Sequence, residues 1–134
     1  MDKVAIIACP GYEERSVRRS VQDAVEAAGG FSAAVRPGST VLLKVNLLRA
    51  AAPEEAITTH PAVVAAVAGM VRDMGADAII ADSPGSGYRY NRRTMEGVYL
   101  KCGMKEAAQK TGAVLNMDTE AKSVSHPEGL IIKR

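Results

Sequence analysis

The sequence predicts an α/β fold, a three-layer domain with a mainly parallel, Rossmann-like sheet. The first indication is residues 58–87, which read as a helix, a turn, a buried strand and a glycine-rich loop. Apolar side chains recur at helical spacing over residues 62–74. Residues 78–81 (AIIA) form a short apolar run, which is typical of a strand covered on both faces. The second indication is that two strand–helix–strand crossovers follow one another, which favours parallel strands and right-handed connections.

Hydrophobic periodicity and turn residues place the remaining elements. Strands are expected at residues 3–8, 40–47, 78–81, 113–117 and 129–133. Helices are expected at residues 16–28, 62–74, 94–101 and 105–110. Within the second strand, the apolar residues 41, 43, 45 and 47 share one face, and Leu42, Lys44 and Asn46 share the other.

The ends of the central helix carry clear signals. Pro61 suits the first helical turn, where its missing N–H costs nothing. Thr59 or His60 then stands near the N-cap, and Gly75 ends the helix. This helix is therefore the best-defined element of the chain.

The amino-acid composition limits which class of protein this chain can be. The chain has 134 residues, 47% of them hydrophobic, which fits one globular domain over residues 1–134. A net charge of +2 does not favour nucleic acid or a membrane surface as partner. The apolar run near the N-terminus is too short for a secretory signal, so we expect a cytoplasmic protein.

The two cysteines, Cys9 and Cys102, form no CxxC pair, and we expect both to be buried, inert thiols. We therefore expect no cofactor, iron–sulfur cluster or zinc in this chain. Residues 129–133 end the chain on a strand-like run, which suggests the N-terminal fragment of a longer protein. An unfinished sheet exposes a strand edge, so we also expect a homo-oligomer.

The candidate site lies where the second and third strands end. One helix connects these strands, so their carboxyl ends should place Lys44, Asn46 and Asp82 on one rim, where ligands of α/β sheets bind. We expect catalytic roles for Lys44 and Asp82, and for His60 at the helix start. The alternatives are that Lys44 snorkels from the sheet end or forms a structural pair with Asp82, and that His60 is only a cap.

The loop after the third strand adds candidate ligand-binding residues. Ser83, Gly85 and Gly87 could turn backbone N–H groups towards an anion, although the loop is neither a P-loop nor a dinucleotide fingerprint and could be a plain tight turn. Arg89, Arg92 and Arg93 would then cover the site as a flap. The same basic segment, with its interleaved tyrosines, could also be a solvated loop or a small RNA-binding surface.

Three segments carry a resemblance to a known family: VLLKVNL at 41–47, TTHP at 58–61 and ADSPG at 81–85. They resemble the N-terminal part of the uncharacterised domain-of-unknown-function family number three-six-two. The resemblance implies an α/β fold and a redox association, because domains of this family are often followed by a ferredoxin-like segment with 4Fe-4S clusters. We therefore expect the ligand-binding part of a redox-linked protein, with a site for a small anionic ligand. The alternative is a non-catalytic module that binds an anion or a partner protein.

Overall fold

The centre of the protein is a parallel sheet of three strands, seen in a computed structural model that describes residues 3–85 and 87–131. The strands are β1 (Thr40–Lys44), β2 (Asp77–Ala81) and β3 (Val114–Leu115), and their order in the sheet follows the chain, β1-β2-β3. The expected α/β class with a parallel sheet is therefore confirmed.

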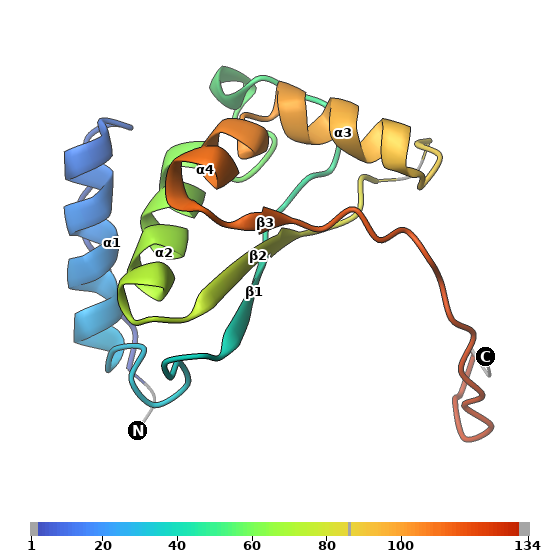
Figure 1. Ribbon diagram of the computed structural model, residues 1–134, viewed down its shortest axis with the longest axis horizontal. Coiled ribbons are helices and arrows are strands. Elements are labelled where there is room, and N and C mark those ends of the chain that lie inside the picture. Colours follow the sequence, from blue (N-terminus) through green and yellow to red (C-terminus); the bar gives the residue numbers. More distant parts are fainter. Residues whose placement is uncertain (1–2, 86, 132–134) are drawn as a thin grey trace.

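Four α-helices and one short 3-10 helix connect the strands (Figure 1). They are α1 (Glu14–Ala28), η1 (Pro53–Glu55), α2 (Pro61–Asp73), α3 (Arg92–Lys101) and α4 (Met104–Thr111). All four expected helices are confirmed, with ends that differ from the predicted ones by up to two residues. The N-cap of α2 is His60, whose Nδ1 accepts the N–H of Ala62 at 3.2 Å.

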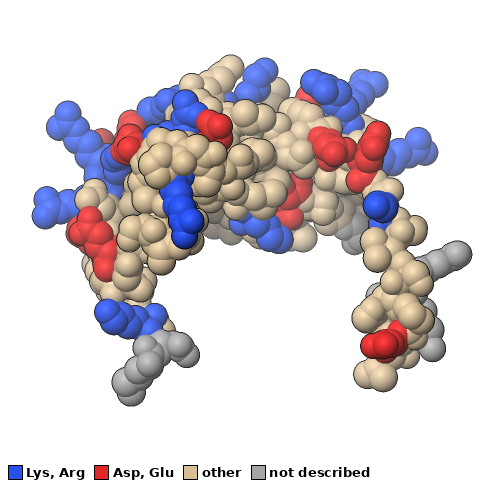
Figure 2. Space-filling model, turned by 60° about the horizontal axis from the view of Figure 1, so that its bottom comes forward, with Lys and Arg blue, Asp and Glu red and all other residues tan. Residues whose placement is uncertain are grey.

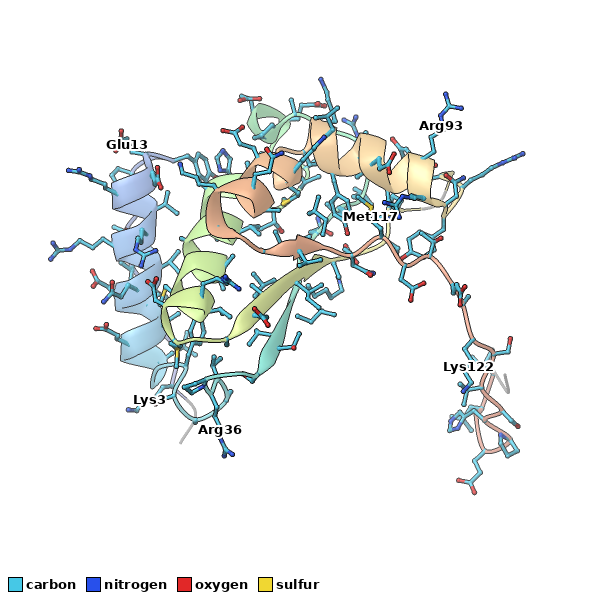
Figure 3. The ribbon with its side chains drawn as sticks, viewed as in Figure 1. Lys3, Glu13, Arg36, Arg93, Met117 and Lys122 are labelled. Carbon is cyan, nitrogen blue, oxygen red and sulfur yellow. The ribbon has the colours of Figure 1, made fainter. Side chains whose placement is uncertain are left out.

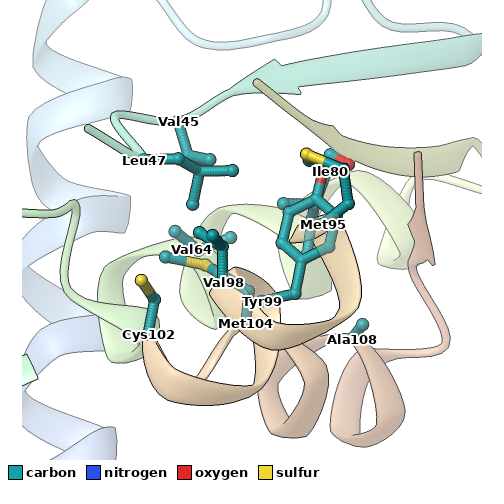
Figure 4. Close-up of a cluster of buried hydrophobic side chains, with 10 residues drawn as sticks. All are labelled: Val45, Leu47, Val64, Ile80, Met95, Val98, Tyr99, Cys102, Met104 and Ala108. Carbon is teal, nitrogen blue, oxygen red and sulfur yellow. The ribbon is translucent and has the colours of Figure 1, made fainter. Parts of the chain in front are cut away.

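Helices α2, α3 and α4 pack on one face of the sheet, and α1 packs on α2 on the side away from the strands (Figure 1). On that face the core lies between β2 and helices α2, α3 and α4, and its largest members are Leu47, Ile80 and Tyr99 (Figure 4). A second, smaller cluster joins α2 to the start of β2. The sheet and the layer of helices on its one face therefore account for two of the three expected layers.

The other face of the sheet carries a row of apolar side chains. The strand register aligns Leu42 with Ile79 and Ile79 with Val114 across the three strands. Leu42 and Val114 are exposed, and Ile79 is half-buried. Parallel sheets are normally covered on both faces, so this row is the least protected apolar surface of the sheet.

Two predicted strands do not form within the described residues. Residues 3–8 run beside α1, where Ala8 O accepts a hydrogen bond from Ser20 Oγ, and they pair with no strand of the sheet. Val4 and Ile6 are 87% and 91% exposed, so the apolar pattern that predicted a strand is not buried. Residues 129–131 also form no strand, and residues 132–133 lie outside the described residues.

The cysteines differ in their environments. Cys102 is fully buried in the core, as expected, and its thiol approaches the carbonyl of Arg49. Cys9 is exposed, so the prediction of a buried thiol there is wrong. It follows the unpaired residues 3–8, which leave it without a sheet to cover it.

Charged side chains of both signs are interspersed on the face of the molecule that Figure 2 shows, over a largely uncharged surface. The surface ion pairs of the protein include Arg18 with Asp73 and Arg72 with Asp77. None of the helices in the described part of the chain is long and apolar enough to span a membrane.

Candidate functional site

The carboxyl ends of β1 and β2 bring Lys44 and Asp82 together. The parallel register places Lys44 beside Ala81, and Asp82 is the next residue along the chain. Lys44 Nζ lies 3.1 Å from Asp82 Oδ1. The Lys44 side chain is 72% exposed and the Asp82 side chain only 14%, so the carboxylate is the fixed member of the pair. The predicted proximity of these two residues is therefore present in the fold.

Backbone groups hold this ion pair in place. Asp82 Oδ2 accepts a hydrogen bond from the N–H of Leu47 at 3.0 Å, which fixes the carboxylate on the chain that leaves β1. Lys44 Nζ also donates to the carbonyl of Val45 at 3.4 Å. An ammonium group has three N–H donors. After these two bonds, one donor remains for a ligand.

The pair lies at the edge of a shallow hollow of about 480 Å³ on the helix-free face of the sheet. The hollow is lined by Leu42, Lys44, Ala81, Asp82, Ser83, Pro84, Tyr90 and Asn116. The prediction included Lys44, Asp82 and Ser83 but missed Tyr90 and Asn116. Asn116 follows the short strand β3, and its N–H donates to the carbonyl of Ile80, so the end of β3 contributes to the same rim.

The two glycines of the loop have structural reasons to be glycine. Gly85 N–H donates to the carbonyl of Leu48 at 2.6 Å, and a Cβ at residue 85 would lie only 2.9 Å from that oxygen. Gly87 has a φ of +100°, in the region that favours glycine. Neither glycine lines the hollow. Of the predicted ligand-binding residues in this loop, Ser83 alone reaches it.

Asn46 and the three arginines lie away from the hollow. Asn46 Nδ2 donates to the carbonyl of Ile57, and its N–H donates to Thr59 Oγ1, so Asn46 ties the loop before α2 to the end of β1. Arg92 pairs with Glu96 on α3. Arg93 points outward from the start of α3 (Figure 3), and Arg89 is exposed. The fold therefore does not bring these arginines over Lys44 and Asp82.

His60 lies on the other side of the sheet layer. Its ring stacks on Tyr12, with ring centroids 3.6 Å apart and planes inclined by 12°. Both rings line a second hollow among the helices, which contains neither Lys44 nor Asp82. The expectation that His60 faces the same rim is wrong, because α2 covers the opposite face of the sheet.

Tyr99 supports the site from the core. Its ring is fully buried, and its hydroxyl lies 3.1 Å from the carbonyl of Asn116 and 3.4 Å from that of Ile80. Burial raises the pKa of Tyr99 to about 12, so its hydroxyl stays protonated and remains a donor. Tyr99 therefore ties the ends of β2 and β3 together beneath the hollow.

Burial also lowers the pKa of His60 below its usual value of 6.5, against a smaller opposing effect of Glu54. The folded protein then binds fewer protons at this residue than the unfolded chain does near pH 6. We expect the contribution of His60 to stability to be complete above pH 6.5 and to be lost as the pH falls through the folded pKa. Protonation of Nδ1 would also remove the acceptor that caps α2.

Urea unfolding at pH 7.5 and pH 5.5 measures this loss. His60→Asn keeps a side-chain cap but cannot titrate, so the difference in unfolding free energy between the two pH values should be smaller in this variant than in the wild type. An equal difference in both proteins would exclude His60 as the source.

A metal site is not apparent in the described ranges. Within residues 3–85 and 87–131, no three His, Cys, Asp or Glu side chains gather closely enough to hold a metal ion. The lysine, carboxylate, hydroxyl and amide groups around the hollow are instead suited to hydrogen bonding with a small polar ligand.

Comparison with known proteins adds a family and one relative. The family model described as "Domain of unknown function (DUF362)" matches residues 41–134. A thylakoid-associated protein, sll1697, from Synechocystis sp. is 39% identical over 84 residues, which is 63% of this chain and 26% of that protein. The matched segment thus spans about a quarter of the relative's length. No solved structure matches the chain.

Proposed function

From the premise that this chain belongs to the DUF362 family, whose function is unknown, we propose that its Lys44–Asp82 site binds a small anionic ligand. The observation that carries the proposal is the position of the pair. It stands at the carboxyl ends of adjacent parallel strands, where α/β proteins bind their ligands, and it borders a hollow rather than a packed surface.

The polar groups that border the hollow favour a ligand with oxygen atoms. The remaining N–H donor of Lys44, the hydroxyl groups of Ser83 and Tyr90 and the amide of Asn116 surround the same space. Asp82 holds the lysine ammonium at the rim without filling the hollow. A phosphate, sulfate or carboxylate group bound there would accept hydrogen bonds from Lys44 and from the hydroxyl of Ser83, whereas the hydroxyl proton of Tyr90 is donated to the carbonyl of Asp118.

We extend the same proposal to the role of this chain within a larger protein. The chain would provide the ligand-binding part of a redox-linked protein whose 4Fe-4S clusters lie outside this chain. The support is the resemblance of three segments to a family whose domains often precede ferredoxin-like segments, together with a relative that is much longer than the matched region. In an enzyme of this kind Lys44 would supply a fixed positive charge, and Asp82 would position it or accept a proton.

A non-catalytic module is the second candidate. The apolar row of Leu42, Ile79 and Val114 lies on the face that carries the hollow, and a partner protein could cover both. The two candidates differ in what Asp82 does. In an enzyme its carboxylate takes part in the reaction, whereas in a module it only holds Lys44.

Titration with inorganic phosphate tests the proposed ligand. In the wild type we expect saturable chemical-shift changes of the backbone amides around Lys44, Ser83 and Asn116. Lys44→Met should abolish them, because it removes the ammonium group but keeps a long side chain. Lys101→Met is the matched control, since Lys101 is an exposed lysine on α3 that does not line the hollow.

Two outcomes decide the proposal. Equal shift changes in Lys44→Met and Lys101→Met would overturn the anion site. Phosphate binding that survives in Asp82→Asn with no loss of a measurable turnover would favour the non-catalytic module, because the amide can still accept the N–H of Leu47 while the carboxylate base is lost.

A further inference from the structure

The helical layer contains a second hollow, on the side of the protein away from the Lys44–Asp82 site. It has a volume of about 460 Å³, within the size range of small-molecule sites. Helix α2 forms its floor, and residues of α1 and α4 form its walls. In Figure 1 these three helices stand in one row, with α2 in the middle.

The floor consists of small residues. Ala62, Ala65, Ala66 and Gly69 follow one another along α2 and line the hollow. From Ala62 to Gly69 the helix rises by about 10 Å, and the guanidinium of Arg18, which lies against Gly69, ends the floor there. Because these side chains end at Cβ or lack one, the floor lies below the flanking helices, and the surface is a slot instead of a flat patch.

The composition of α2 makes this open floor unusual. Residues 61–71 contain no charged side chain, so the helix is apolar on all sides. Helices of this kind are normally covered on every side. Here one side is covered by the sheet, and the opposite side floors the slot.

Polar groups stand at both ends of the slot. At the start of α2 are the stacked rings of Tyr12 and His60. Because His60 Nδ1 accepts the N–H of Ala62, the ring proton of the neutral imidazole is on Nε2, which is a donor. At the far end, Arg18 pairs with Asp73 at 2.5 Å.

An ion pair also joins the two walls. Lys110 Nζ on α4 lies 2.6 Å from the carboxylate of Glu14 on α1. Both residues line the slot. The charges at the walls are thus largely paired with each other, and the neutral His60 offers a ligand its Nε2 donor at the start of α2.

We propose that this slot binds a small, flat, mainly apolar ring compound whose carbonyl or carboxylate oxygen accepts a hydrogen bond from His60 Nε2. The narrow apolar floor selects a flat body about 10 Å long, close to the length of two fused rings with one substituent. The Nε2 donor of His60 at one end of the slot orients it. This ligand differs from the anion proposed for the sheet side, because its binding comes mainly from apolar contact.

The shape of the slot favours a small molecule over a protein partner. A helix of a partner would need a groove wide enough for its side chains, about 10 Å from axis to axis. The Glu14–Lys110 pair crosses between the walls and obstructs such a helix. A flat ring is much thinner than a helix, so it needs no groove of that width.

Fluorescence titration with 2-naphthoate, a flat bicyclic carboxylate, tests the proposal. We expect saturable binding to the wild type, and binding at least tenfold weaker in Ala65→Leu, because the larger side chain fills the floor. Gly97→Leu is the matched control: it also adds a leucine to a helix, at an exposed position of α3 with open space around it. It should bind 2-naphthoate as the wild type does.

His60→Asn tests the orienting donor. Asparagine still caps α2 but lacks the Nε2 donor and the imidazole ring, so we expect about threefold to tenfold weaker binding of 2-naphthoate, the effect of one hydrogen bond. Absence of saturable binding to the wild type below about 1 mM, or equal affinities of wild type and Ala65→Leu, would overturn the proposal. Phosphate binding at Lys44 would be unaffected by either variant, so the two sites are tested separately.

Discussion

Leu47→Ala should destabilise the protein by about 2–5 kcal/mol, the usual cost of truncating a fully buried leucine. Leu47 is completely buried and belongs to the core cluster that includes Val64, Ile80 and Met95 (Figure 4). Its backbone N–H also binds Asp82, so the cavity would open directly behind the candidate site. Urea unfolding followed by circular dichroism measures the change.

Leu100→Ala is the control for this prediction. Leu100 is 65% exposed on α3, so its truncation removes few contacts, and we expect a change within about 0.5 kcal/mol. Equal losses of unfolding free energy in Leu47→Ala and Leu100→Ala would mean that the side chains around Leu47 pack more loosely than their burial implies.

Gly103→Ala should cost about 1–3 kcal/mol. Gly103 joins α3 to α4 with a φ of +74°, a conformation that alanine adopts only with strain. A Cβ at this position would also lie 2.9 Å from Cγ and 3.2 Å from Cβ of Pro61, the first residue of α2. Because the proline ring is rigid, the start of α2 or of α4 must shift.

Gly97→Ala is the contrasting variant, and urea unfolding measures the stability of both variants. Gly97 lies inside α3 in an ordinary helical conformation, and a Cβ added at this position would meet no atom within 4 Å. Alanine should therefore stabilise the protein there by about 0.5–1 kcal/mol. If both substitutions shifted the unfolding midpoint in the same direction, the close approach of Gly103 to Pro61 would be in error.

Local signals predicted the central part of the fold well. Pro61, His60 and Gly75 marked the ends of α2 within one or two residues, because caps and helix breakers act over a few residues only. The apolar run at residues 78–81 matched β2 except for its first residue. The pairing of Lys44 with Asp82 also followed from sequence, since one crossover helix makes β1 and β2 neighbours.

The predictions that were wrong concern contacts between distant segments of the chain. Residues 3–8 have the pattern of a strand, but a strand also needs an edge to pair with, and the pattern cannot show whether one is within reach. His60 illustrates the same limit. Its place at the start of α2 put it at the correct end of the sheet, but the sequence did not show on which face α2 would pack.

The remaining site residues show a third limit. Gly85 was interpreted as a position for close approach of a ligand, and it is the carbonyl of Leu48 that approaches it. Tyr90 and Asn116 reach the hollow from a loop and from the end of a two-residue strand. Tyr90 was noticed only as part of the basic segment, and Asn116 belongs to no recognisable motif, so only the fold shows that they meet Lys44.

The strand order β1-β2-β3 has a consequence for how the chain reaches this structure. Each strand pairs with the one that precedes it in sequence, so the sheet can be assembled progressively, one crossover at a time. Among the described strands, no pairing has to wait for a distant segment to arrive, and each step closes a loop that contains its own helix. The folding barrier should therefore be set by the first unit, β1-α2-β2, on which α4 and β3 then condense.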